Sequence, residues 1–231
     1  MINLIDYGIG KLRTQKKLSK LRKIYTKFQR FTMISERTYT HNLLIAEGVS
    51  NLDGCIIECG VWRGGMIAGL ADLLGNNRNY YLFDSFQGLP EAQTIDGEAA
   101  IRWQSNTSAE NYYENCYAPR EYAQKAMEMS IADNFFLKEG WFEETLPNFR
   151  LNEKIAFLRL DADWYKSTYT CLENLFDLVV EGGIIVLDDY YTWDGCSRAV
   201  HDFLSKTSKT ERIESFNGIC VIKKKEELNY E

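Results

Sequence analysis

Residues 157–165, FLRLDADWY, and residues 182–190, GGIIVLDDY, decide the fold of this chain. Each stretch contains a short apolar run, typical of a parallel strand buried on both faces, and each run ends in paired carboxylates. Ligands bind at the carboxyl ends of the strands in an open α/β sheet. Two neighbouring strands would therefore bring four acids to one edge of the sheet, namely Asp161, Asp163, Asp188 and Asp189. Because these carboxylates repel one another, a hard divalent cation with oxygen ligands is the simplest compensation.

A ligand-binding loop is predicted upstream, where residues 55–65 read CIIECGVWRGG. The glycines allow the backbone to approach a ligand closely, and the loop leads into the N-terminus of a helix. The next predicted strand, residues 79–84, ends in Asp84, which follows Gly60 by 24 residues. An acid at about this spacing commonly binds ribose hydroxyls. The two segments together predict a pocket for a ligand that carries adenosine.

Composition limits the possible classes of protein. A chain of 231 residues with 45% hydrophobic residues is expected to form one domain with a packed core. The net charge of −6 argues against nucleic acid as a partner, because phosphate contacts need a basic surface. The six cysteines form no CxxC pair, which favours free thiols in a reducing cytoplasm. No signal peptide and no apolar run of the ~20 residues that cross a bilayer is apparent.

Residues 1–31 differ in composition from the rest of the chain. They contain nine Lys and Arg residues and one acid, Asp6, so the remainder of the chain is strongly acidic. Leu18, Leu21, Ile24 and Phe28 lie at helical spacing, which predicts a basic amphipathic arm. We expect this arm to dock on the acidic body or on a second subunit of a homodimer or larger homo-oligomer. A membrane surface is the alternative partner.

The remaining segments predict alternating helices and strands. Residues 91–118 are polar with scattered aromatic side chains and little periodicity, as expected of a lid over a binding site. Helices are predicted at residues 36–49, 118–130, 165–180 and 196–205, and further strands at 134–138, 211–215 and 219–222.

With these motifs in place, the chain resembles a class I S-adenosylmethionine-dependent methyltransferase. More narrowly, it resembles the macrocin O-methyltransferase (TylF) family, whose known members methylate sugar hydroxyls of antibiotics. The resemblance is carried by ECGVWRGG at 58–65, DSFQGLP at 84–90, LRLDADWY at 158–165 and the stretch at 182–190. It runs from about residue 31 to residue 222, so that the arm 1–31 lies outside the methyltransferase domain 32–231. It implies a Rossmann-like α/β fold: a mostly parallel seven-stranded sheet, helices on both faces and a C-terminal antiparallel hairpin.

The resemblance also implies roles for individual residues. The cofactor S-adenosylmethionine would lie against Thr32, Met33, Glu58, Gly60, Asp84, Ser85, Gly140, Trp141, Phe142 and Asp161. Asp161, Asp188 and Asp189 would hold Mg²⁺, which would lower the pKa of an acceptor hydroxyl on a sugar-bearing small molecule. Asp163 would remove the proton, and with Asp161 would form the catalytic pair. Ala162 replaces the glycine of the family's commoner Asp-Gly-Asp motif and leaves both carboxylates in place.

Other interpretations remain open at this point. The acceptor is a catechol-like phenol in one of them, and in another the domain binds the cofactor without catalysis. Asp163 could instead cap the helix that begins near Tyr165, and His201 could serve as a different base.

Overall fold

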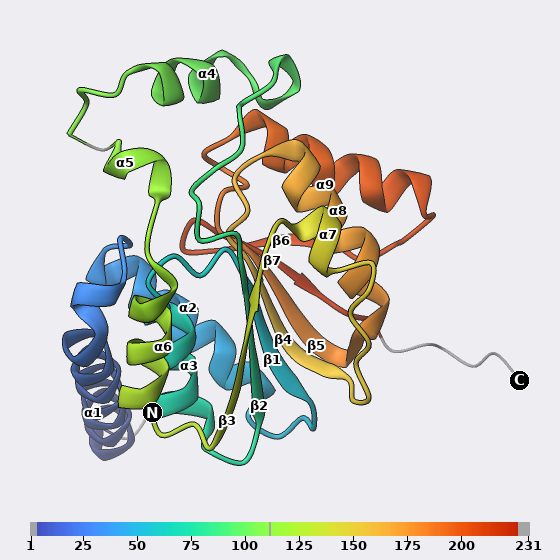
Figure 1. Ribbon diagram of the computed structural model, residues 1–231. Helices are drawn as coiled ribbons and strands as arrows, with labels where there is room; N and C mark the ends of the chain where they lie inside the picture. The colour runs from blue at the N-terminus through green and yellow to red at the C-terminus, as the bar shows by residue number, and fades with distance from the viewer. Residues whose placement is uncertain (1–3, 111, 226–231) are drawn as a thin grey trace, which may run out of the picture.

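The computed structural model describes residues 4–110 and 112–225 as one sheet with helices on both faces (Figure 1). Seven strands are described, in the order β3-β2-β1-β4-β5-β7-β6. Their bounds are β1 Cys55–Cys59, β2 Asn79–Asp84, β3 Asn134–Glu139, β4 Ile155–Leu160, β5 Val179–Leu187, β6 Ile213–Phe216 and β7 Ile219–Lys223. The pairs among β1 to β5 are parallel, whereas β7 runs antiparallel to both β5 and β6. The predicted α/β fold with its C-terminal antiparallel hairpin is confirmed.

Two layers of helices cover the sheet (Figure 1). The helices are α1 Leu4–Phe28, α2 Glu36–Ala46, α3 Gly65–Leu74, α4 Glu98–Ser105, α5 Tyr113–Cys116, α6 Arg120–Met129, α7 Phe142–Thr145, α8 Tyr165–Leu175 and α9 Asp194–Lys206. Helices α1, α2, α3 and α6 pack on one face and α7, α8 and α9 on the other. Helix α4 stands above the carboxyl ends of the strands.

The central strands are mostly apolar because both of their faces are covered. Along β4, Phe157 belongs to the core layer beneath α1–α3, and the next residue, Leu158, belongs to the layer beneath α8 and α9. Neighbouring side chains of a strand point to opposite faces, so a strand between two helix layers is apolar at most positions; Glu58 in β1 and Arg159 in β4 are charged exceptions that pair with each other. This is the physical reason for the short apolar runs in the sequence.

Two segments differ from the prediction. The helix predicted at 165–180 ends at Leu175 and is followed by a 3-10 turn, Phe176–Leu178, so the prediction of helix at residues 179 and 180 is wrong. Val179 pairs with Ile155 in the sheet, and the register shifts before Ile184, in a segment where Gly182 has a φ of 76°. Within the predicted lid, residues 98–105 form α4, a helix too short and too polar for its period to be evident.

The predicted arm is a helix that packs onto the domain. Residues 1–3 of the arm lie outside the described residues, as do residues 226–231 of the domain. Leu21, Ile24 and Phe28 are buried against α2 and α3, and Lys27 forms an ion pair of 2.5 Å with Asp72. No helix in the described part of the chain is long and apolar enough to cross a membrane.

Candidate active site

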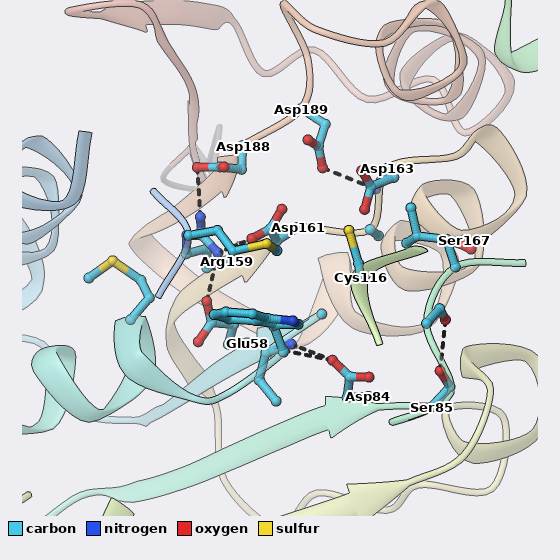
Figure 2. A pocket seen from close by; sticks show the side chains of 18 of the residues that line it. Glu58, Asp84, Ser85, Cys116, Arg159, Asp161, Asp163, Ser167, Asp188 and Asp189 are labelled. Atoms are coloured by element: carbon cyan, nitrogen blue, oxygen red, sulfur yellow. Dashed lines mark hydrogen bonds and ion pairs between the residues drawn. The ribbon is translucent and has the colours of Figure 1, made fainter. Parts of the chain in front are cut away.

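A cavity of about 380 Å³ opens at the carboxyl ends of the central strands (Figure 2). All of the site residues predicted from the sequence line it: Thr32, Met33, Glu58, Gly60, Asp84, Ser85, Gly140, Trp141, Phe142, Asp161, Asp163, Asp188 and Asp189. Their individual roles stay predictions, but their assembly in one place is a property of the structure.

The glycine loop is tied to the neighbouring strands at its base. Gly60 has a φ of 83°, and a Cβ there would lie 1.8 Å from the carbonyl oxygen of Asp161. The carboxylate of Asp84 accepts hydrogen bonds from the backbone N–H groups of Val61 and Trp62, both at 2.8 Å. Burial raises the pKa of Asp84, and these backbone donors oppose the shift. The ends of β1, β2 and β4 therefore form one rigid floor.

The segment after α1 reaches the cavity because Gly65 has no side chain at the point where the two segments meet. A Cβ on Gly65 would lie 2.5 Å from the carbonyl oxygen of Phe31, so a larger residue there would push the segment away. Tyr39 donates a hydrogen bond of 2.7 Å to the carbonyl oxygen of Gly65 and keeps the two segments together. Thr32 and Met33 consequently stand at the cavity, and Met33 is 38% exposed.

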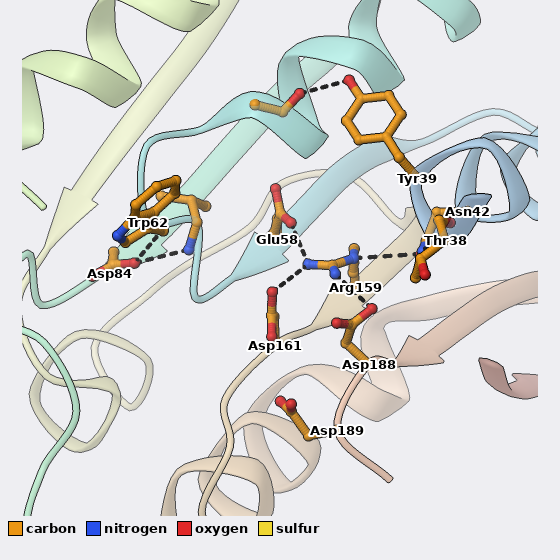
Figure 3. A network of polar contacts seen from close by, with 12 residues as sticks. Thr38, Tyr39, Asn42, Glu58, Trp62, Asp84, Arg159, Asp161, Asp188 and Asp189 are labelled. Atoms are coloured by element: carbon orange, nitrogen blue, oxygen red, sulfur yellow. Dashed lines mark hydrogen bonds and ion pairs between the residues drawn. The ribbon is translucent and has the colours of Figure 1, made fainter. Parts of the chain in front are cut away.

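A buried arginine neutralises much of the acidic edge (Figure 3). Arg159, 1% exposed, places Nη1 2.6 Å from Oε1 of Glu58 and 2.8 Å from Oδ2 of Asp161. Its Nη2 lies 2.7 Å from Oδ1 of Asp188, and its Nε donates to Oδ1 of Asn42 at 3.4 Å. Buried charges are tolerated when they are paired in this way. The chain itself thus supplies a cation where the sequence predicted only a metal.

The role of Arg159 was missed by sequence reasoning, although a signal was present. A lone cation inside the apolar run FLRL at 157–160 must find acidic partners if the strand is buried. The pKa of Glu58, one of these acidic partners, shows what burial costs the carboxylate. Burial raises it to about 8, and the guanidinium of Arg159 opposes the shift.

Three acids form a separate cluster beside this network. Asp161, Asp163 and Asp189 each offer an oxygen, and these oxygens lie within 4.8 Å of one another. The backbone N–H of Asp163 also donates to Oδ2 of Asp189 at 3.0 Å. Among the residues that the structure describes, no Lys, Arg or His forms an ion pair with Asp163 or Asp189. Burial and the charge of Asp163 raise the pKa of Asp189 well above its ordinary value.

The cluster differs by one residue from the metal-binding set predicted above. Asp161 and Asp189 belong to both sets. Asp188, which pairs with Arg159, is absent from the cluster, and Asp163 takes its place. Asp161 belongs to the cluster and also pairs with Arg159. The carboxylate chemistry of the cluster suits a hard divalent cation.

Asp163 is held by a tryptophan. The indole N–H of Trp193 donates to Oδ1 of Asp163 at 3.0 Å. Burial and the charge of Asp161 raise the pKa of Asp163 to about 8, and this hydrogen bond opposes the shift. Asp163 does not cap α8, because the backbone N–H of Tyr165 donates instead to Oδ1 of Asp96 at 2.7 Å. The helix-capping interpretation of Asp163 is therefore wrong.

The lid contributes side chains that the sequence did not single out. Trp103, Tyr113 and Cys116 line the cavity together with Trp193. The ring of Trp103 lies 6.0 Å from that of Trp193, which connects α4 with the partner of Asp163. His201, considered above as a different base, is absent from the lining and bonds through Nε2 to the hydroxyl of Tyr190 at 2.9 Å.

Comparison with known proteins gives a consistent result. Residues 17–225 match the Macrocin-O-methyltransferase (TylF) family. The match begins within α1, so the expectation that the similarity starts near residue 31 is wrong. The 8-demethyl-8-(2,3-dimethoxy-alpha-L-rhamnosyl)-tetracenomycin-C 4'-O-methyltransferase of Streptomyces olivaceus is 31% identical over 193 residues, which are 79% of this chain and 69% of that protein.

Two further similarities support the same fold and chemistry. The demethyldecarbamoylnovobiocin O-methyltransferase of Streptomyces niveus is 32% identical over 163 residues, which are 68% of this chain and 60% of that protein. Among solved structures, the O-methyltransferase NovP superposes with a TM-score of 0.71 at 25% identity, covering 85% of this chain and 83% of the other. The predicted methyltransferase fold is confirmed.

Proposed function

Because the chain belongs to the macrocin O-methyltransferase (TylF) family, we propose that it transfers a methyl group from S-adenosylmethionine to a sugar hydroxyl of a small glycosylated molecule. We further propose that the transfer depends on a divalent cation. The observation that carries this proposal is the single cavity in which the glycine loop and Asp84 face the acid cluster. In this proposal the loop and Asp84 would hold the cofactor, and the acid cluster would face the acceptor.

The cofactor side of the cavity has an unused acceptor beside the glycine loop. Gly60 lacks a Cβ where one would collide with the carbonyl oxygen of Asp161, so the loop packs directly against the end of β4. Oε2 of Glu58 is buried and has no hydrogen-bond partner among the described residues. Unpaired buried acceptors are costly, so a ligand that donates an N–H or O–H group there would be favoured. Glu58, Gly60 and Asp84 would hold S-adenosylmethionine, which supplies the transferable methyl group.

The metal side requires a choice between the two overlapping sets of acids. We assign Asp161 and Asp189 as ligands, because both belong to the cluster and to the set implied by the family resemblance. Arg159 contacts Asp161 as well as Asp188, but only Asp161 also offers an oxygen within the cluster. The role of Asp188 as a third ligand stays a prediction, tested by Asp188→Asn. A bound divalent cation would supply Lewis acidity that favours ionisation of the acceptor hydroxyl.

Asp163 is the proton acceptor in this assignment. One of its oxygens is engaged by Trp193, and the other is available. Burial and the charge of Asp161 raise the pKa of Asp163, whereas a divalent cation held by Asp161 and Asp189 would lower it and favour the ionised carboxylate that a general base requires. Because the carboxylate is fixed at one oxygen, the reaction gains from positioning as well as from proton transfer.

The proposal is tested by incubating the protein with methyl-labelled S-adenosylmethionine, magnesium and three acceptor panels: glycosides, nucleotide sugars and phenols. We expect label on glycoside hydroxyls, loss of transfer with EDTA and recovery with excess magnesium. Asp189→Asn should abolish transfer while the affinity for S-adenosylhomocysteine, measured by calorimetry, changes less than threefold.

Two results would contradict the proposal in different ways. Full turnover in EDTA would remove the metal from the mechanism. Methylation of phenols but not of any sugar hydroxyl would overturn the proposed acceptor class while leaving the transfer chemistry in place.

A further inference from the structure

The lid contains a left-handed turn beside the active site. The φ angles of Tyr113, Glu114, Asn115 and Cys116 are 45°, 52°, 57° and 60°, and ψ is 44° at Glu114 and 33° at Asn115. L-amino acids avoid this conformation because the Cβ comes too close to the following carbonyl oxygen. Four such residues in succession, none of them glycine, require contacts from outside the turn to hold them, and such strain is concentrated at functional sites.

Asn115 supplies those contacts. Its side-chain N–H donates to the carbonyl oxygen of Leu89 at 2.7 Å, and the backbone N–H of Leu89 returns a hydrogen bond of 3.0 Å to the carbonyl oxygen of Asn115. The amide of Gln104, on α4, donates to Oδ1 of Asn115 at 2.9 Å and to the carbonyl oxygen of Pro90 at the same distance. These hydrogen bonds, called the clamp below, join Asn115 at the end of the lid to residues 89–90 before it and to Gln104 on α4.

A glycine makes the clamp possible. Gly88 has a φ of 87°, and a Cβ there would lie 2.5 Å from the carbonyl oxygen of Asn115. The close approach of the two segments therefore depends on the residue before Leu89 having no side chain.

The clamped turn directs two side chains into the cavity. Cys116 and Tyr113, which is 53% exposed, line it, whereas Glu114 does not. Figure 2 shows Cys116 between the acid cluster and the end of β2, where Asp84 lies. Burial raises the pKa of the Cys116 thiol, with the charges of Asp163 and Asp161 adding to the shift, as expected for a neutral group close to these acids.

We propose that Tyr113 and Cys116 form one wall of the acceptor subsite, next to the acid cluster, and that Asn115 is the positioning residue that holds this wall in place. The inference rests on the proposed function, since it names where the acceptor binds. A sugar ring would present a hydroxyl to Asp163 and its less polar C–H face to the tyrosine and the thiol.

The first test is kinetic, with 4-nitrophenyl α-L-rhamnoside as the acceptor probe. Asn115→Gly removes the side-chain amide but tolerates a positive φ, and Glu114→Gly is the matched control, because it frees the same turn without removing a clamp contact. We expect KM for the rhamnoside to rise at least tenfold in Asn115→Gly, with kcat within threefold of wild type. In Glu114→Gly, KM should change less than twofold. Equal KM values in both variants would overturn the role of Asn115.

The second test needs no acceptor and separates this inference from the proposed function. The other five cysteines are at most 2% exposed, so iodoacetamide should modify Cys116 selectively in the folded protein. We expect alkylation of Cys116, located by peptide mass spectrometry, to be at least fivefold faster in Asn115→Gly than in Glu114→Gly. Gln104→Leu, which breaks the clamp from α4, should behave like Asn115→Gly and replaces it if that variant does not fold.

The outcomes are distinguishable. If no acceptor is methylated by the wild type, the proposed function fails, while the alkylation rates still decide whether Asn115 clamps the turn. Faster alkylation with an unchanged KM would overturn the wall as part of the acceptor subsite. Equal alkylation rates in all variants would overturn the clamp.

Discussion

Replacing Arg159 with methionine tests the electrostatic organisation of the site. The guanidinium is the shared partner of Glu58, Asp161 and Asp188, at 2.6, 2.8 and 2.7 Å, and is 1% exposed. Methionine fills a similar length of side chain without the charge, so three carboxylates would lose their cation. Removing one member of a buried ion pair destabilises a protein by about 3–5 kcal/mol. For a domain of this size, the melting temperature should fall by about 6–20 °C.

The assay is urea denaturation of the wild type and Arg159→Met, in parallel with Lys27→Met as the control. Lys27 and Asp72 form an ion pair whose side chains are 35% and 12% exposed, so its loss should cost about 0–1 kcal/mol. A loss below about 1 kcal/mol in Arg159→Met would refute the reasoning, because the carboxylates would then not depend on this cation.

A compensating variant identifies the origin of the loss. If uncompensated charge is the cause, adding Glu58→Gln and Asp188→Asn to Arg159→Met should recover at least half of the lost stability. If the loss came from packing around the longer side chain, the triple variant would stay as unstable as the single one. Magnesium should also raise the melting temperature of Arg159→Met more than that of the wild type, since more unpaired acids would then be available to it.

Three further predictions follow from other contacts of the site. Trp193→Phe removes the N–H group that holds Asp163 and should lower kcat by roughly 10-fold or more, since hydrogen bonds to charged groups contribute about 1.5–3 kcal/mol. The control is Trp164→Phe, which loses a hydrogen bond to Pro90 and should lower kcat far less. Equal losses of kcat in the two variants would contradict the positioning role of Trp193. Asp96→Ala leaves the part-buried N–H groups of Tyr165 and Gln93 without their acceptor and should lower the free energy of unfolding by about 1–3 kcal/mol in urea titrations, whereas Asp96→Asn should cost less. Gly60→Ala places a Cβ 1.8 Å from the carbonyl oxygen of Asp161, so binding of S-adenosylhomocysteine should be lost in calorimetry, and wild-type affinity would show that the loop can move.

Local patterns were sufficient for the sheet and for the edge at which the candidate site lies. The apolar runs before Asp161 and Asp188 predicted buried parallel strands, because a strand covered on both faces has few polar positions along its length. Gly60 and Asp84 followed from the same logic, since loops after such strands open onto one edge of the sheet. The boundary errors at Val179 and at α4 arose where local preference was weak and packing decided the state.

By itself, the sequence determined which acids gather at the edge of the sheet, because strand polarity and order place them there whatever their partners are. Only the tertiary structure decided how those acids divide. Arg159 lies 101 residues from Glu58 along the chain, yet pairs with it, with Asp188 and with one oxygen of Asp161. Asp163 and Asp189 have no ion pair with Arg159 and form, together with Asp161, the cluster suited to a cation. The lid turn at Asn115 is likewise invisible in the sequence, since its left-handed conformation is held by residues 11 and 26 positions away. The hydrophobic periodicity of a segment predicts which face of a strand or helix each residue occupies. Which charged side chains form ion pairs depends on the distances between them, and these are set only when the chain has folded.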